Sequence, residues 1–239
     1  MELDGRVAIV TGGATGLGSE VCRQLAAAGV RVGVNYSRSK DAAHELAASL
    51  AAPAVAVRAD VRHDAEVRSM VAEVERSLEG PVELLVNNAG VTTYVDAADL
   101  DAITDEDWES ILDVNLVGTW RCVRAVAAGM RARGGGAIVN VASDAVFHLQ
   151  GSSIPYIVSK VGVVALTQIL AQAIAPVRVN AVAPGWMDTP WLDRYIPQDV
   201  VAALRRGDES VVGVDVVARE VLHLLVDDDV TGETIQMSG

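Results

Sequence analysis

The fold is decided by residues 6–18, RVAIVTGGATGLG, whose first six residues form a short β-branched run typical of a buried strand. A glycine-rich turn follows at once, and the helical pattern of Ser19–Ala28 ends at Gly29, a residue that suits a helix C-cap. Glycines let a backbone approach a pyrophosphate, and the N-terminus of a helix offers it free N–H groups. We therefore predict a dinucleotide site, with a plain tight turn as the alternative. The expected contacts are Gly12, Thr15, Gly16, Leu17 and Gly18.

The rest of the chain repeats this alternation of strand and helix. No repeat, low-complexity tract or linker divides the sequence, so we expect a single domain over residues 1–239. Hydrophobic residues make up 51% of the chain but aromatic residues only 4%, which suits a parallel sheet buried on both faces, whose strands are continuous Val and Ile runs. Further strands are expected at 30–36, 54–59, 82–86, 137–141, 177–183 and 233–237. Further helices are expected at 40–50, 64–78, 105–131, 155–176 and 215–226.

Charge and hydropathy exclude several classes of function. The formal net charge of −13 argues against nucleic acid and anionic membrane surfaces as partners, because both attract basic patches. Residues 1–4 are acidic and lack the basic start of a signal peptide. The apolar run 161–177 is interrupted by two glutamines, which favours a buried helix over a membrane span. Cys22 and Cys122 are isolated in helical patterns, so we expect two reduced thiols, a cytoplasmic protein and no metal site.

The end of the second predicted strand bears on the choice of cofactor. A carboxylate at this place would bind the adenosine ribose of NAD, but the sequence there is Tyr36-Ser37-Arg38. A guanidinium beside hydroxyl groups suits the 2′-phosphate of NADP(H). We therefore expect NADP(H), with NAD(H) as the alternative if Arg38 is only a solvated loop charge. At the end of the third strand, Asp60, followed by Val61, could accept a hydrogen bond from the adenine amino group.

Two asparagines stand at places where the chemistry of an amide matters. Asn88, in the run Asn-Asn-Ala-Gly at 87–90, could tie neighbouring strands together, while Ala89 and Gly90 leave room for a cofactor. A hairpin or an Asx turn is the alternative for this run. Asn115 lies in the middle of the longest predicted helix, where Asn is a poor choice. It is either a core or kink residue or an active-site amide that holds water.

Tyr156 and Lys160 form the most specific chemical unit of the chain. They are four residues apart on the helix that Pro155 opens, so they share one face of it. A free phenol has a pKa of about 10, and a cation within about 4–6 Å lowers that pKa toward the range in which a phenol acts as an acid or base. The hydroxyl of Ser143, which follows the strand at 137–141, could hold a carbonyl or alcohol oxygen at the same point. The unit suits carbonyl/alcohol interconversion beside a hydride carrier.

Chance could also place a Tyr and a Lys one helical turn apart. With four Tyr and two Lys in 239 residues, the odds of one Tyr-x-x-x-Lys are about 3%. The chain otherwise uses Arg, because Lys40 and Lys160 are its only lysines. Lys160 therefore supplies a compact ammonium, whose pKa responds to burial, in a chain that otherwise uses Arg. This choice favours the catalytic interpretation.

An aromatic segment with little periodicity follows the sixth predicted strand. Trp186, Trp191 and Tyr195 fall within it, and long irregular stretches in compact domains are often lids. We interpret residues 186–212 as an apolar substrate lid, with a satellite apolar cluster as the alternative. His148, in the loop before the catalytic helix, is either a substrate contact or a surface histidine. The expected substrate contacts are Ser143, His148, Gln150, Trp186 and Trp191.

Taken together, the motifs resemble those of the short-chain dehydrogenase/reductase family, from end to end and in that family's shorter form. The motifs are Thr11-Gly12-x-x-x-Gly16-x-Gly18, Asn87-Asn88-Ala89-Gly90, Asn115, Ser143, Tyr156-x-x-x-Lys160 and Pro184-Gly185. The likeness implies a nicotinamide cofactor and a doubly wound, Rossmann-type α/β fold, with one parallel sheet of about seven strands and helices on both faces.

The same resemblance assigns roles to individual residues. It implies that Tyr156 is the acid/base, and that Lys160 lowers the pKa of Tyr156 and holds the nicotinamide ribose. It implies that Ser143 binds the substrate oxygen, and that Asn115 keeps a water that relays protons to Lys160. By the same likeness, Thr189 matches the position that contacts the nicotinamide carboxamide. The further cofactor contacts expected near it are Pro184, Gly185 and Met187.

Within the family the chain is most similar to 3-oxoacyl-acyl-carrier-protein reductases, through the turn Asn35–Ser39. It differs from them because the catalytic helix ends early, at Pro176, and lacks basic residues there. The net charge of −13 would also repel an acidic carrier protein, although Arg131 and Arg133 could form a local basic patch. The catalytic helix has almost no charged face, so we expect a second subunit to cover it in a homodimer or homotetramer.

We therefore expect an NADP(H)-dependent oxidoreductase that transfers a hydride between nicotinamide and a ketone or secondary alcohol, with 3-oxoacyl thioesters among the candidate substrates. An NAD(P)-dependent alcohol dehydrogenase that oxidises a small or cyclic alcohol is the alternative enzyme. A nucleotide-binding regulator without turnover is the alternative from another class, and the intact Ser-Tyr-Lys-Asn set argues against it.

Overall fold

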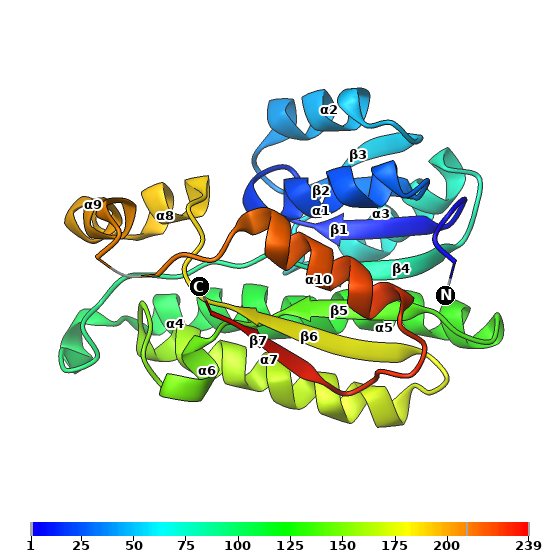
Figure 1. Ribbon diagram of the computed structural model, residues 1–239. Helices are drawn as coiled ribbons and strands as arrows, with labels where there is room; N and C mark the ends of the chain where they lie inside the picture. The colour runs from blue at the N-terminus through cyan, green and yellow to red at the C-terminus, as the bar shows by residue number, and fades with distance from the viewer. Residues whose placement is uncertain (1, 209, 239) are drawn as a thin grey trace.

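A computed structural model describes residues 2–208 and 210–238 of the chain. One sheet of seven parallel strands has the order β3-β2-β1-β4-β5-β6-β7 (Figure 1). The strand order reverses between β1 and β4, which is the switch point of a doubly wound sheet. The predicted Rossmann-type parallel sheet is thus confirmed. The strands are β1 Val7–Thr11, β2 Arg31–Tyr36, β3 Ala54–Arg58, β4 Val82–Asn87, β5 Ala137–Val141, β6 Arg178–Pro184 and β7 Thr234–Met237.

Helices cover both faces of this sheet. They are α1 Gly16–Ala27, α2 Lys40–Ser49, α3 Asp64–Ser77, α4 Asp105–Leu112, α5 Gly118–Ala132, α6 Ala145–His148, α7 Ile154–Ala173, α8 Pro190–Tyr195, α9 Gln198–Arg206 and α10 Val214–Val226. Side chains of α1, α2 and α10 form one apolar core on one face of the sheet. Side chains of α3, α5 and α7 form a second core on the other. Figure 1 shows α1 and α10 across the front of the sheet.

The buried strands deliver the site residues to one edge of the sheet. Every residue of β1, β5 and β6 is buried, because helices cover both faces, and this explains the continuous apolar runs. The register pairs Thr11 with Asn87 and Asn87 with Asn140, so β1, β4 and β5 end side by side. The residues that follow these strands, among them Gly12, Asn88 and Ser143, therefore meet at this edge.

The helix predicted over 105–131 is not continuous, and the break contains Asn115. A π-helical turn, Asp113–Val117, separates α4 from α5. The Asn115 carbonyl accepts a hydrogen bond from the Thr119 hydroxyl (2.8 Å), while its side-chain amide bonds to the backbone of Val91 in a neighbouring loop. Such single-turn widenings occur where a side chain is committed to partners outside the helix, often at functional sites.

The segment 186–212, predicted to be irregular, is mostly helical. It contains α8 and α9, of six and nine residues, which are too short to give a clear periodic pattern. The two ends of the segment meet, because the Val212 N–H donates to the Trp186 carbonyl (2.8 Å). Arg205 on α9 forms a salt bridge with Asp188 (2.8 Å), and apolar side chains of both helices form a small separate cluster. The segment 186–212 thus forms a satellite apolar cluster, and some of its residues also line the cavity described below.

Among the described helices, α7 alone is long and apolar enough to cross a membrane by length and composition. It packs against β6, α4 and the π-helical turn and buries Lys160, as the core helix of a folded domain does. Its outer face exposes Val158, Val161 and Ile169. The second subunit expected to cover this face stays a prediction.

Candidate active site

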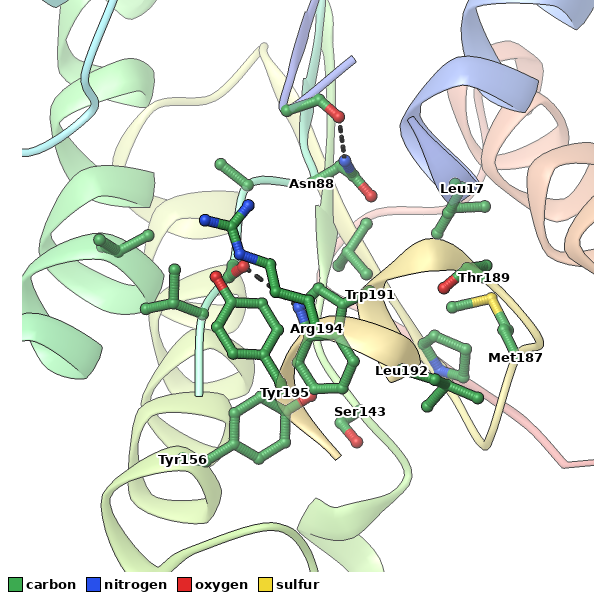
Figure 2. Close-up of a pocket in the computed structure, with 18 of the residues that line it drawn as sticks. Leu17, Asn88, Ser143, Tyr156, Met187, Thr189, Trp191, Leu192, Arg194 and Tyr195 are labelled. Carbon is green, nitrogen blue, oxygen red and sulfur yellow. Dashed lines mark hydrogen bonds between the residues drawn. The ribbon is translucent and has the colours of Figure 1, made fainter. Parts of the chain in front are cut away.

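A large cavity opens at the carboxyl ends of β1, β4, β5 and β6. Its volume is about 930 Å³, and it lies at the switch point, where doubly wound sheets bind their ligands. Of the predicted site residues, all line this cavity except Gly18 and Asn115. Figure 2 shows part of its wall, with Asn88 and Leu17 high in the view and Ser143 and Tyr156 low.

The glycine turn leaves space for the close approach of a ligand. Gly12 and Gly16 have φ angles of +59° and +55°, which glycine adopts without strain. A Cβ on Gly18 would lie 2.3 Å from the Gly12 carbonyl oxygen and 2.6 Å from the Asn88 side-chain nitrogen. Gly18 therefore packs behind the turn, where it lets Asn88 donate to the carbonyls of Thr11 and Gly12 (3.0 Å each). The prediction that Asn88 ties neighbouring strands together is thus confirmed for β1 and β4.

The cavity wall beside β2 and β3 contains a paired and an unpaired arginine. Arg38 lines the cavity and forms no salt bridge within the described parts of the chain. Arg62 binds both carboxylate oxygens of Asp60 (2.6–3.1 Å), and this hydrogen bonding is the main reason that the pKa of Asp60 falls to about 2. Sequence reasoning missed Arg62, although it lies two residues from Asp60. The adenine contact expected of Asp60 stays a prediction.

Ser143, Tyr156 and Lys160 meet at the other end of the cavity. The i, i+4 spacing on α7 places the Lys160 ammonium 5.7 Å from the centre of the Tyr156 ring. Lys160 is only 5% exposed, and its ammonium donates to the Val141 carbonyl at the end of β5 (2.7 Å). Ser143 lies close enough to Tyr156 to lower the pKa of its phenol, and both residues lie low in Figure 2, below Trp191.

The pKa values of this group differ from those that the spacing predicts. Burial raises the pKa of Tyr156 to about 12; the nearby side chain of Ser143 opposes the shift, and Asp144 adds to it. Burial also lowers the pKa of Lys160 to about 8. The expectation that Lys160 brings the pKa of Tyr156 toward neutrality is therefore wrong for this structure, because desolvation of the phenolate outweighs an ammonium that is bonded to Val141. At neutral pH Tyr156 is a protonated phenol and Lys160 is mostly charged.

Asn115 lies behind the cavity wall. Its amide oxygen accepts from the Val91 N–H (2.9 Å), and its amide nitrogen donates to the Val91 carbonyl and the Ser159 hydroxyl (3.0 Å each). Ser159 in turn donates to the Tyr156 carbonyl (2.7 Å). Asn115 therefore joins the Val91 loop to the first turn of α7, in agreement with the core or kink interpretation. The proton relay through a water to Lys160 stays a prediction.

The segment 186–212, predicted to be a lid, contributes aromatic rings to the cavity wall. Trp191 on α8 donates its indole N–H to the Gly90 carbonyl (3.3 Å). Its ring centre lies 6.0 Å from that of Tyr156 and 5.1 Å from that of Tyr195. Trp191 thus connects α8 to both the Asn-Asn-Ala-Gly turn and α7.

Several cavity residues were not predicted as contacts from the sequence. Asp144 directly follows Ser143, and burial raises the pKa of its carboxyl group; its Oδ2 lies 4.0 Å from Nε2 of His148. Only Asp144, next to Ser143, and Arg194, within the aromatic segment, had a position in the sequence that could have suggested them. The residues are Arg62, Tyr94, Asp144 and Arg194.

Comparisons with known proteins agree with this geometry. The family model for short chain dehydrogenase matches residues 6–199. Ketoacyl reductase 2 of the granaticin polyketide synthase from Streptomyces violaceoruber is 46% identical over 77% of this chain and 74% of the relative. An acetoacetyl-CoA reductase from Rhizobium meliloti is 35% identical over 98% of this chain and 97% of the relative. A solved short-chain dehydrogenase/reductase from Burkholderia xenovorans has a TM-score of 0.85 at 30% identity, covering 97% of this chain and 95% of its own.

The chain belongs to the short-chain dehydrogenase/reductase family. The predicted resemblance is confirmed, and 3-oxoacyl-acyl-carrier-protein reductases are among the relatives. The family's enzymes are oxidoreductases that use nicotinamide cofactors. The residues present fit such a cofactor: α1 begins at the glycine turn, and Gly16 lacks a Cβ where one would press against Thr189 at 3.3 Å.

Proposed function

We propose that this chain is an NADP(H)-dependent carbonyl reductase that converts the ketone of a 3-oxoacyl thioester, or of a related 3-oxo compound, into a secondary alcohol. The observation that carries the proposal is the meeting of Ser143, a protonated Tyr156 and a buried Lys160 at one end of the cavity. The names of two relatives, a ketoacyl reductase and an acetoacetyl-CoA reductase, support the substrate class.

Three side chains complete a reduction in this geometry. When bound, NADPH supplies a hydride to the ketone carbon. The Ser143 hydroxyl holds the ketone oxygen, and Tyr156 gives its proton to that oxygen as negative charge develops there, so that the ketone gains one hydride and one proton. Lys160, mostly charged below pH 8, stabilises the phenolate that Tyr156 becomes.

The high pKa of Tyr156 favours reduction over oxidation. An alcohol dehydrogenase would need Tyr156 as a base, whereas a phenol with a pKa of about 12 is almost fully protonated at neutral pH. The protonated form is the one that a ketone reductase uses.

The preference for NADP(H) rests on Arg38. Its guanidinium lines the cavity beside Tyr36 and Ser37, and the carboxylate of Asp60 on the same wall is engaged by Arg62. We expect kcat/KM for NADPH to exceed that for NADH by about tenfold or more, and Arg38→Gln to remove most of this preference. Equal use of both cofactors by the unmodified protein would contradict the proposal.

The test of the reaction follows NADPH absorbance with a panel of ketones, offered free and as thioesters. We expect turnover of 3-oxoacyl thioesters. A carrier-protein thioester should perform no better than a coenzyme A thioester, because the net charge of −13 repels an acidic carrier. Tight binding of NADPH without turnover of any ketone would favour the nucleotide-binding regulator instead.

The exposed face of α7 supports a proposal for the assembly, and two buried thiols support one for the compartment. The exposed Val158, Val161 and Ile169 on α7 (41–62% exposed) support a second copy of the chain as the cover of that face, in a dimer or tetramer. Light scattering that gives a monomer at micromolar concentration would contradict this. Cys22 and Cys122 are both buried and free, which supports the cytoplasm as the compartment.

A further inference from the structure

We propose that Arg194 and Tyr195 form an anion-binding subsite at the mouth of the cavity, which takes a carboxylate or phosphate carried by the substrate. The identity of this ligand as a substrate rests on the proposed reductase function. The subsite itself rests on the geometry of α8.

Aromatic contacts hold the Arg194 guanidinium in place. Its central carbon lies 5.4 Å from the centre of the Tyr195 ring, and Tyr195 packs against Trp191, whose ring reaches Tyr156. The Trp191 indole is itself fixed to the Gly90 carbonyl. A cation–π contact with a ring uses none of the N–H donors of a guanidinium, so they are free for an anion.

The charges around Arg194 leave it without a protein partner. Of the three arginines that line the cavity, Arg62 is paired with Asp60, whereas Arg38 and Arg194 form no salt bridge within residues 2–208 and 210–238. The nearest carboxylate in sequence, Asp193, is engaged by Arg205 (3.0 Å). Arg205 also bonds to the carboxylate of Asp188, six residues before Arg194. An unpaired guanidinium in a cavity of so acidic a protein is therefore available to a ligand anion.

The position of Arg194 favours the substrate over the cofactor as the source of the anion. In Figure 2, Arg194 and Tyr195 lie on one side of Trp191, while Leu17 and Thr189 lie on the other. The glycine turn and the start of α1 already serve a pyrophosphate on the side of Leu17. A ketone held between Ser143 and Tyr156 would extend its remaining chain past Trp191 toward Arg194. The substrate class is accordingly a 3-oxo compound with an anionic group: a free 3-oxo acid, or a thioester whose carrier bears phosphates.

The experiment compares matched substrate pairs in matched variants. Acetoacetate is compared with ethyl acetoacetate, and acetoacetyl-CoA with the neutral S-acetoacetyl-N-acetylcysteamine. The variants are Arg194→Gln, Arg194→Lys and the control Arg206→Gln, which removes an exposed arginine of α9 that is paired with Asp208. We expect Arg194→Gln to lower kcat/KM about tenfold for the anionic member of a pair, mainly through KM, and to change the neutral member less than about twofold. Arg194→Lys should recover part of the loss, and Arg206→Gln should match the unmodified protein.

The outcomes separate the subsite from the proposed reaction. The pair that shows the difference identifies the carboxylate or the phosphate as the anion. Equal losses for charged and neutral substrates, no loss at all, or weakened NADPH binding in a fluorescence titration would each overturn the subsite. Calorimetry with acetoacetate or coenzyme A gives an independent measure: binding that depends on Arg194, without turnover of any ketone, would uphold the subsite and refute the reductase. Turnover of ketones without a preference for anionic substrates would uphold the reductase and refute the subsite.

Discussion

The glycine turn and the lid border the same cavity but are built in different ways. The turn is made of backbone, with no space for a Cβ on Gly18 and with the Asn88 amide bonded to two carbonyls. The lid is made of side-chain contacts, through the salt bridges of Arg205 and the indole hydrogen bond of Trp191. A site made of backbone recognises the pyrophosphate that all dinucleotides share. Side chains of the lid can be substituted one at a time, and each substitution can change the fit of the substrate. We infer that the turn determines the class of reaction and the lid the choice of substrate.

The largest expected effect falls at Tyr156 on α7, which contacts the lid through Trp191. Tyr156→Phe removes the proton donor but keeps the ring that Trp191 contacts. We expect kcat to fall about a thousandfold, because a positioned acid contributes about 10²–10⁴ in rate, while the dissociation constant of NADPH stays within about twofold. Stopped-flow kinetics and fluorescence titration measure the two. Unchanged turnover would remove Tyr156 from the mechanism.

The next effect tests the backbone character of the turn. Gly18→Ala places a Cβ against the Gly12 carbonyl and the Asn88 amide, so the turn must open and release the tie to β4. We expect NADPH affinity to fall about a hundredfold. The matched control is Gly129→Ala on α5, where the added Cβ would meet only the flexible end of Arg133 and should leave NADPH affinity unchanged. Equal affinities in both variants would show that the turn tolerates side chains after all.

The pH dependence of the rate tests the role of Lys160, which belongs to neither the glycine turn nor the lid. The pKa of Lys160 is lowered by burial from 10.5 to about 8, so the ammonium is present below pH 8 and lost above it. Ketone reduction should therefore decline as pH rises through about 8, approaching tenfold per pH unit, while Tyr156, with a pKa of about 12, stays protonated. A rate that is flat between pH 7 and 10 would contradict the role of Lys160.

The same group makes an opposite prediction for stability. Between pH 8 and 10.5 the unfolded chain keeps the Lys160 proton that the folded chain has lost, so the contribution of Lys160 to the free energy of unfolding should rise with pH over this window. Cys22 and Cys122, whose pKa values are raised by burial, contribute a fall in the same window. Lys160→Met should remove that rise. Urea unfolding of both proteins at pH 8 and pH 10 gives the contribution of Lys160 as the difference between them.

The sequence was informative where backbone rules apply and silent where side chains meet through space. The β-branched runs predicted the strands because strands buried on both faces must be apolar throughout, and the i, i+4 spacing placed Tyr156 and Lys160 together because a helix does so wherever it packs. The predicted fall in the pKa of Tyr156 was wrong because the spacing of two residues along a helix shows that they are close but not how deeply they are buried. Arg194 was missed because Arg205, which engages the neighbouring carboxylate of Asp193, lies on another helix. Arg62 was missed although its partner Asp60 lies only two residues away, because the sequence does not show which way the two side chains turn.

The smallest expected effect tests whether one side-chain contact fixes the lid. Trp191→Phe keeps an aromatic ring near Tyr156 and Tyr195 but removes the hydrogen bond to the Gly90 carbonyl. One such bond is worth about 0.5–1.5 kcal/mol, so kcat/KM for the ketone should fall about threefold to tenfold, with NADPH affinity nearly unchanged. The control is Trp120→Phe, since Trp120 lies on the surface of α5, stacked with Arg124. If Trp191→Phe matched the control, the lid would be held by the salt bridges of Arg205, and its selectivity for substrates would then depend on α9 as much as on α8.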